Sequence, residues 1–403
     1  MGSRVGIKRS VLGACSSLAL LVACAHVPER KPLPEDGVEE ATVFGIPRVR
    51  AWGDAPPPWD HLWLEESDEE LQERYSGVYG KPHTYLAISG GGADGAFAAG
   101  LLLGWTAAGD RPEFTVVTGI SAGALVAPFA FLGSEYDEVL RSVAVDLEND
   151  DVFERRRLLK AIRTDAFATT EPLEALIANY VDETLMEQIA KEHRKGRVLN
   201  VGTTNLDSLR PVIWSLGEIA DSGHPKALEL IRLILLASAS MPAAFTPVMI
   251  PVEYDGEMYD ELHVDGGTAS QVFLYPAGVD LHAVQKRLHV PGRSKVYVIR
   301  NARLDPRYEA VDNRLVPISG RSISSVVRTQ GIGDLYRIFL ETCRDGLDFH
   351  LAYIPASFVE ESESEFDPAY MTKLFDTTYA TAKAGYPWER MPPELKDAPV
   401  RCR

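Results

Sequence analysis

The chain has 403 residues, of which 45% are hydrophobic and 25% are charged, and its formal net charge at pH 7 is −17. This length and composition suit a large α/β enzyme domain with a sizeable core. The acidic balance argues against nucleic acid as a partner and against electrostatic docking on an anionic lipid surface, because both are negatively charged.

The N-terminal segment has the features of a bacterial export signal. Basic residues precede the apolar run 11–23, which is too short to span a bilayer but has the length of a secretory signal core. The run ends Leu-Val-Ala-Cys, which resembles the lipobox of bacterial lipoproteins. We therefore expect residues 1–23 to be a signal peptide and Cys24 to be lipidated, with a chance cysteine or a buried apolar segment as the alternative. Because Ala25 is not an aspartate, the expected location is the bacterial cell envelope, at the periplasmic face of the outer membrane.

Residues 24–60 are predicted to be a lipidated tether, because prolines and acidic residues are frequent and few side chains could fill a core. Within them, the more apolar piece 44–52 could pack on the edge of the domain. Ser67 and Glu70 have the spacing of a capping box, which predicts a short helix. The rest of the chain, 61–403, is expected to form one domain.

Residues 85–132 contain one pattern twice: a short apolar run, a glycine-rich turn, and small and apolar residues at helical spacing. This strand–turn–helix plan is the unit from which parallel α/β sheets are built. The glycines of the two turns are Gly90, Gly91, Gly92 and Gly95, then Gly119 and Gly123.

The second turn is G-x-S-x-G, with Ser121 at its centre. A sharp strand-to-helix turn of this kind leaves room only for small neighbours and exposes the serine oxygen at the carboxyl end of the sheet. Backbone N–H groups and the positive end of the helix dipole would then point at the group that Ser121 attacks. The alternative is an ordinary Gly/Ser turn.

The first turn fits two functions. It matches the G-x-G-x-x-G pattern of dinucleotide-binding folds, and it could equally form an oxyanion hole from consecutive glycine N–H groups. A dinucleotide fold needs an acidic residue after the next strand, but Glu113 precedes that strand and the serine turn follows it. The oxyanion interpretation is therefore favoured.

The remaining chain alternates helix and strand. Helices are expected at 134–146, 171–180, 184–192, 226–240, 323–343 and 368–384, and strands at 197–204, 211–214, 295–300 and 348–354. This order predicts a mixed or mostly parallel sheet with helices on both faces. The charged insert 150–195 is a candidate lid.

A serine nucleophile needs a base, which is usually a late histidine. His263, His282, His289 and His350 are available, but none lies in a small-residue turn, so each is interpreted as a surface or satisfied core residue. A better candidate is Asp265, which ends an apolar strand and is followed by Gly266 and Gly267. An Asp-Gly-Gly sequence alone is usually only a turn.

The three motifs, G-G-G-x-x-G, G-x-S-x-G and a distant D-G-G, together resemble those of the patatin-like phospholipases, which are lipid acyl hydrolases. The resemblance implies a three-layer α/β/α domain with a central, mostly parallel sheet. It implies a dyad of Ser121 as nucleophile and Asp265 as base, an oxyanion hole from Gly90, Gly91 and Gly92, an acyl-serine intermediate, and a lipid or ester substrate. It implies no metal and no cofactor.

Several points stay open. Many members of the family have a basic residue where this chain has Asp94, which would repel a lipid phosphate or simply cap a helix. Candidates for an acyl pocket, or for the core, are Phe97, Leu101–Leu103, Phe129–Phe131 and Phe245. Cys343 and Cys402 could form a disulfide or remain free thiols. The alternatives to a Ser–Asp hydrolase are a Ser–His–Asp carboxylesterase and a non-catalytic envelope lipoprotein, and the oligomeric state is not predicted.

Overall fold

The computed structural model describes residues 30–58, 65–145, 154–155, 168–242, 244–362, 364, 366–396 and 402. The predicted signal peptide 1–23 and the predicted lipidation site at Cys24 lie outside these residues. Within the described part of the chain, no helix is long and apolar enough to cross a membrane.

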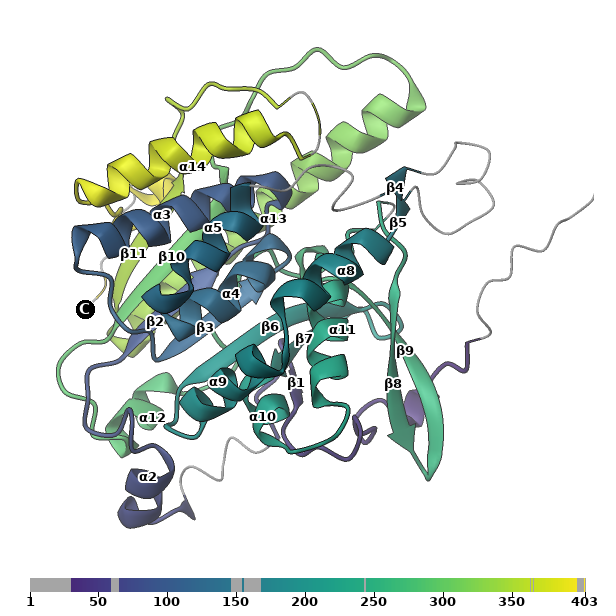
Figure 1. Ribbon diagram of the computed structural model, residues 1–403, viewed down its shortest axis with the longest axis vertical. Coiled ribbons are helices and arrows are strands. Elements are labelled where there is room, and N and C mark those ends of the chain that lie inside the picture. Colours follow the sequence, from purple (N-terminus) through teal and green to yellow (C-terminus); the bar gives the residue numbers. More distant parts are fainter. Residues whose placement is uncertain are drawn as a thin grey trace, which may run out of the picture.

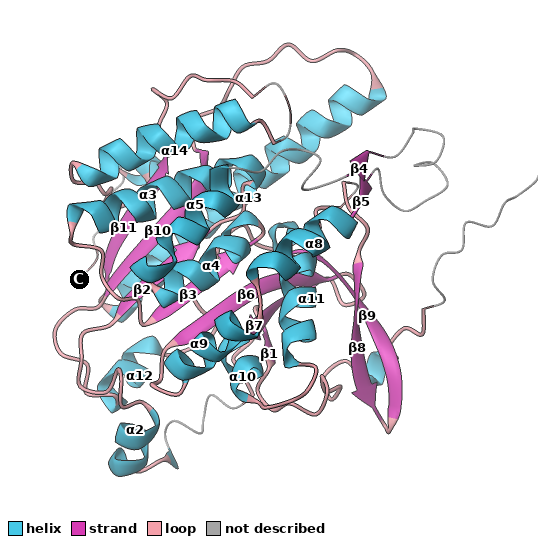
Figure 2. Ribbon diagram, in the orientation of Figure 1, coloured by secondary structure: helices cyan, strands magenta, loops and turns pink. Residues whose placement is uncertain are grey.

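A nine-stranded sheet organises the molecule, and its middle is parallel, as the sequence predicts. Five neighbouring strands run in the same direction and pair in register (Figure 2). In spatial order they are β6 (Val198–Asn205), β3 (Val116–Ile120), β2 (Thr84–Ile88), β10 (Lys295–Arg303) and β11 (Asp348–Ile354). The carboxyl ends of all five therefore lie at one edge of the sheet, which is where ligand sites form in such folds.

Antiparallel strands extend the sheet beyond β6. They are β7 (Arg210–Ser215), β1 (Arg50–Trp52), β9 (Glu257–Asp265) and β8 (Val248–Tyr254). β7 pairs with β6 and β1, whereas β9 pairs with β6 and β8. A separate short pair joins β4 (Glu154–Arg155) and β5 (Ala168–Thr169).

Alternate residues of the central strands pack into two different cores, one on each face. Leu86 and Ile88 of β2 belong to the larger core, and Tyr85 and Ala87 to the smaller one. Figure 1 shows the helices that cover the first face, and α13 lies against the second. The larger core is covered by α3 (Gly95–Ala108), α4 (Ala122–Leu132), α5 (Asp137–Val145) and α14 (Pro368–Lys383), and the smaller one by α13 (Leu315–Asp345) and α12 (Leu281–Arg287). The three-layer α/β/α architecture is thus confirmed.

The remaining helices are α2 (Asp68–Arg74), α8 (Glu171–Tyr180), α9 (Glu183–His193), α10 (Leu216–Asp221) and α11 (Ala227–Ala239). The predicted capping box forms at the start of α2, where Ser67 accepts from the Glu70 N–H and Glu70 accepts from the Ser67 N–H. α13 begins at Leu315 rather than at Ile323. Pro317 lies in its first turn, where a missing N–H costs no hydrogen bond, so the proline does not end the helix.

The prediction of a tether over 24–60 was wrong for most of its length. Residues 30–58 run along the domain, and β1 adds a strand to the sheet by pairing with β7. Val43 is completely buried, and Ile46 and Val49 are nearly so. The apolar piece 44–52 packs at the edge of the sheet, as its composition suggested, but the strand that β1 forms with β7 was not predicted.

The C-terminal tail is tied to the domain by a disulfide between Cys343 of α13 and Cys402, whose Cα atoms are 4.6 Å apart. The two cysteines left open in the sequence therefore pair in the structure. The bond links residues that are 59 positions apart.

We expect Arg50→Ala to lower the free energy of unfolding by about 3–5 kcal/mol, because it would leave a buried carboxylate without its cation. Arg50 forms an ion pair with Glu261, which is 1% exposed. Burial opposes ionisation of Glu261, but the hydrogen bond from His263 and the charge of Arg50 hold its pKa at about 2. Urea unfolding measures the effect. The matched control is Arg48→Ala, whose ion pair with Glu218 is partly solvated and should be worth less than about 1 kcal/mol. Equal losses in the two variants would contradict this account.

Candidate active site

Ser121 lies in the sharp turn between β3 and α4, with a backbone conformation that non-glycine residues rarely adopt (φ 55°, ψ −125°). The turn is possible because Gly119 and Gly123, two positions away on either side, have no side chains. A Cβ at Gly119 would lie 2.4 Å from the Gly123 carbonyl oxygen, and one at Gly123 would lie 2.4 Å from the Ile88 oxygen. Such strain persists at functional sites when the surrounding structure imposes it.

Ser238 supports this turn, and sequence reasoning missed it. The Ser121 N–H donates to the Ser238 hydroxyl at 3.0 Å, and that hydroxyl donates to the Gly202 carbonyl at 2.7 Å. Ser238 is completely buried in α11. The sequence placed it in a buried helix, but nothing in its local pattern indicated which strand it would contact.

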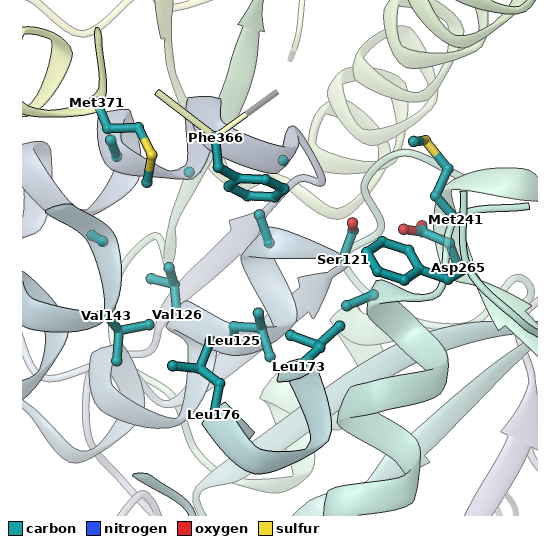
Figure 3. Close-up of a pocket in the computed structure, with 17 residues that line it drawn as sticks. Ser121, Leu125, Val126, Val143, Leu173, Leu176, Met241, Asp265, Phe366 and Met371 are labelled. Atoms are coloured by element: carbon teal, nitrogen blue, oxygen red, sulfur yellow. The ribbon is translucent and has the colours of Figure 1, made fainter. Parts of the chain in front are cut away.

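Asp265 reaches Ser121 because β9 and β3 approach the same stretch of β6 from opposite ends. β3 ends with Ile120 beside Gly202, and the next residue of β6, Thr203, pairs with Asp265. The ends of the two strands therefore face each other, and the side chains of Ser121 and Asp265 both reach the pocket at this junction (Figure 3). The structure brings together the two residues that the motifs singled out.

The electrostatic state of Asp265 suits a base. Burial raises its pKa to about 6, while the hydrogen bonds from the Ser121 side chain and from the Gly267 N–H (2.7 Å) act in the opposite direction. Gly266 packs so tightly that a Cβ there would lie 2.5 Å from the Gly202 carbonyl oxygen. A carboxylate that is ionised at pH 7, yet less stable than one in water, is a better proton acceptor than an ordinary aspartate.

The first glycine-rich turn lies beside Ser121, but its glycines have different roles. The Gly90 N–H donates to the Gln271 carbonyl at 3.2 Å. The prediction that Gly90 donates to the oxyanion was therefore wrong. Its importance is space, because a Cβ there would lie 3.0 Å from the Ser121 Cβ. Among the described residues, the N–H groups of Gly91 and Gly92 have no protein acceptor, and Gly92 has a positive φ of 56°. These two N–H groups are the available donors.

Asn301 of β10 fixes this turn from behind, a role that the sequence did not indicate. Its amide donates to the Ser89 carbonyl at 2.8 Å, and its Oδ1 accepts from the Ala98 N–H at 3.1 Å. A Cβ at Gly91 would lie 2.2 Å from the Asn301 carbonyl oxygen. At the other end of the turn, Gly95 allows α3 to lie close to α4, since a Cβ added at Gly95 would lie 3.1 Å from the Cβ of Ala122.

Gly91→Ala should therefore displace the turn, because the new methyl group meets backbone that cannot move aside. We expect hydrolysis of a soluble ester to fall by about 100-fold, as a shift of about 1 Å in a catalytic group can cost that much. The control is Gly333→Ala in α13, where a Cβ meets nothing within 4 Å. Initial rates and urea unfolding of both variants test this. An active Gly91→Ala protein would remove the turn from the catalytic apparatus.

An apolar pocket opens over Ser121 and encloses about 800 Å³, part of it open to solvent. Figure 3 shows Ser121 and Asp265 at one end, with aliphatic side chains below and Phe366 and Met371 above. Of the side chains that line it, only Ser121 and Asp265 are polar. The apolar members are Ala96, Ala122, Leu125, Val126, Val143, Ala144, Leu173, Leu176, Ala239, Met241, Phe245, Phe366 and Met371.

Comparison with known proteins agrees with this geometry. Residues 86–277 match the family model described as patatin-like phospholipase. Over these residues the chain is similar to the patatin-like phospholipase family. The match links the site to lipid acyl hydrolysis in general. No curated protein matches the chain. Among solved structures, VipD from Legionella pneumophila is similar with 14% identity and a TM-score of 0.37, over 75% of this chain and 67% of that one.

None of the histidines in the described part of the chain lines the pocket. His263 is completely buried, where its Nε2–H donates to Glu261 (3.1 Å) and its Nδ1 accepts from the Thr203 hydroxyl (2.9 Å). Burial lowers the pKa of His263 despite the hydrogen bond to Glu261. Both ring nitrogens are thus occupied, and His263 is the satisfied core residue that the sequence suggested.

Asp94 occupies the N-cap position of α3, but its side chain makes no capping hydrogen bond, so the capping role that the sequence offered for it is not observed. Instead it accepts a hydrogen bond of 2.5 Å from the Tyr370 hydroxyl of α14. Burial raises the pKa of Asp94 to about 6, although the Tyr370 hydrogen bond and the charge of Arg300 oppose the shift. Asp94 therefore joins the glycine-rich turn to α14, which carries Met371 of the pocket.

Most of the predicted acyl-pocket residues belong to the core. Phe97, Leu101, Leu102, Phe129 and Phe131 are all 2% exposed or less, and only Phe245 of the predicted set lines the pocket. The predicted lid 150–195 contributes Leu173 and Leu176 of α8, while 150–153 and 156–167 lie outside the described residues. Among the described residues, no cluster of three or more His, Cys, Asp or Glu could hold a metal ion.

Proposed function

We propose that this protein is a serine lipid acyl hydrolase that uses Ser121 as nucleophile and Asp265 as general base. The observation that carries the proposal is the position of Ser121 and Asp265 at facing strand ends, together at the end of an apolar pocket. The family match supports the reaction class.

In the proposed reaction, Asp265 accepts the proton of Ser121 as the serine oxygen attacks the ester carbonyl. The developing oxyanion takes hydrogen bonds from the N–H groups of Gly91 and Gly92, each worth about 3 kcal/mol in a preorganised site. Asp265 then returns the proton to the departing alkoxide. In the second half, Asp265 takes a proton from the water that attacks the acyl-serine, and it returns this proton to the Ser121 oxygen as the bond to the acyl group breaks and the fatty acid is released.

The shape and chemistry of the pocket favour a fatty acyl chain. Its walls are aliphatic and aromatic, and a hydrocarbon gains about 0.8 kcal/mol for each CH₂ that leaves water. No cationic side chain among the residues that line the pocket selects a head group, so a phospholipid, a lysophospholipid and a neutral ester are all compatible with the site.

For location, we propose acylation of Cys24 and attachment to the outer membrane of a bacterial cell envelope. The support is the lipobox-like Leu-Val-Ala-Cys sequence after an apolar run. Mass spectrometry of the mature N-terminal peptide tests this, and Cys24→Ser should move the protein into the soluble fraction. Unacylated Cys24 in a membrane-bound wild-type protein would contradict it.

The test of function is hydrolysis of medium-chain nitrophenyl esters by wild type, Asp265→Asn and His263→Asn. We expect Asp265→Asn to be inactive. We expect the folded fraction of His263→Asn to keep the turnover of wild type, because both ring nitrogens of His263 are already hydrogen-bonded in the core. Loss of turnover in well-folded His263→Asn, with Asp265→Asn active, would favour a Ser–His–Asp esterase. Absence of wild-type turnover, with micellar lipid as well, would favour a non-catalytic lipoprotein.

A further inference from the structure

The N-terminal half of α13 carries several apolar side chains that no other described part of the chain covers. Leu315 is 81% exposed, Val326 67%, Ile323 57% and Ile318 43%. Figure 1 shows this half of the helix extending away from the three layers, whereas its C-terminal half packs into the smaller core. Isolated exposed apolar residues are common, but four on one helical segment form a contiguous surface that usually has a partner.

The four side chains lie on one side of the helix and form what we call the α13 stripe. Ile318, Ile323 and Val326 follow Leu315 by spacings close to whole helical turns. The charged residues of this half face elsewhere: Arg321 pairs with Glu309 at 3.0 Å, and Arg328 donates to the Leu304 carbonyl. From Leu315 to Gly333 the helix contains no acidic residue.

The inner end of this half of α13 lies beside the catalytic turn. The Gln330 amide lies 3.5 Å from the Thr268 carbonyl and 3.3 Å from the Gln271 amide. Thr268 directly follows Gly267, and the Gln271 amide donates to the Gly267 carbonyl at 2.6 Å. The helix that carries the stripe therefore begins to leave the domain next to the turn that holds Asp265.

We propose that the α13 stripe docks on a lipid surface and presents the pocket to it. The inference rests on the proposed function, since a hydrolase with an apolar pocket must draw its substrate from a lipid aggregate. An amphipathic helix with apolar residues outward, arginines on its other side and no acid suits insertion at the headgroup boundary. The net charge of −17 opposes long-range attraction to anionic lipid, so binding depends on apolar burial.

The test uses the full chain with Cys24→Ser, so that no acyl anchor contributes. Vesicles of phosphatidylcholine, with and without phosphatidylglycerol, are sedimented with this protein and with a variant that adds Leu315→Gln, Ile318→Gln, Ile323→Gln and Val326→Gln. We expect the stripe variant to bind both kinds of vesicle on the order of 100-fold more weakly. Hydrolysis of a soluble nitrophenyl ester should stay within about twofold, because none of the four residues lines the pocket.

The matched control changes the polar positions Ser324, Ser325 and Thr329 of the same helix to Gln, and it should bind vesicles like the parent. Equal vesicle binding by the parent and the stripe variant would overturn the docking inference. If both proteins still hydrolyse the soluble ester, the proposed function would be unaffected by that result. A loss confined to vesicles that contain phosphatidylglycerol would also overturn it, in favour of electrostatic docking. A parent dimer that the stripe variant converts to a monomer, with vesicle binding unchanged, would assign the stripe to a second copy of the chain.

Discussion

Ser121→Ala is expected to reduce ester hydrolysis by on the order of 10⁴-fold or more, because the variant has no atom that can form the acyl intermediate. The fold should persist, since alanine keeps the Cβ and the Ser121 N–H still donates to Ser238. A fluorophosphonate probe gives an independent measurement: mass spectrometry should find it on Ser121 in wild type and nowhere in the variant. Ser222→Ala, at the end of α10, is the control and should behave like wild type.

Ser121→Gly separates the chemistry from the backbone strain at the same position. Glycine also removes the nucleophile, but it adopts a φ of 55° and ψ of −125° without the cost that a side chain brings. We expect this variant to be as inactive as Ser121→Ala and about 1–2 kcal/mol more stable in urea. A fully active alanine variant, or label retained on another serine, would show that the nucleophile lies elsewhere.

The motifs could reveal both the sheet and the catalytic pair because each depends on local chemistry. Gly119, Ser121 and Gly123 determine a turn that only small residues permit, and Asp265 is followed by glycines at the end of an apolar strand. Parallel strands place their carboxyl ends together, which explains the position of Ser121 after β3. Asp265 reaches the same place by another route, because β9 is antiparallel to β6 and ends opposite β3, and the sequence did not indicate that pairing.

The features that the sequence could not reveal depend on contacts between distant segments. Ser238 and Asn301 hold the two catalytic turns through hydrogen bonds to residues far away in the chain, and their own neighbourhoods look like ordinary helix and strand. The Gly90 N–H was assigned to the oxyanion hole because nothing local shows that Gln271 would accept it. The pairing of β1 was hidden by the same limitation, since β7, the strand with which it pairs, follows much later in the chain.

Asp265→Asn is expected to lower hydrolysis by about 10³–10⁴-fold, because an amide cannot accept the Ser121 proton at neutral pH. In wild type, the rate should rise with pH and be half-maximal near pH 6, where the pKa of Asp265 lies, since only the carboxylate acts as base. The variant should lose this dependence together with its activity. Initial rates between pH 4.5 and 8.5 measure both effects, with the range chosen to bracket about two pH units around the pKa.

The same substitution should make the fold more stable, and the sign follows from the direction of the shift. Burial raises the pKa of Asp265 from 3.8 to about 6, so the folded state holds this proton more tightly than the unfolded state. Stability from this group is present below pH 4 and is lost as pH rises through about 6. A neutral asparagine avoids that loss, and we expect the free energy of unfolding to rise by about 1–3 kcal/mol at pH 8 and to change little at pH 4.

The control is Asp255→Asn in the β8–β9 turn of the same hairpin, which should change neither activity nor stability. Were Asp265→Asn less stable at pH 8, the buried carboxylate would be a structural anchor, and its proposed role as a strained base would be wrong.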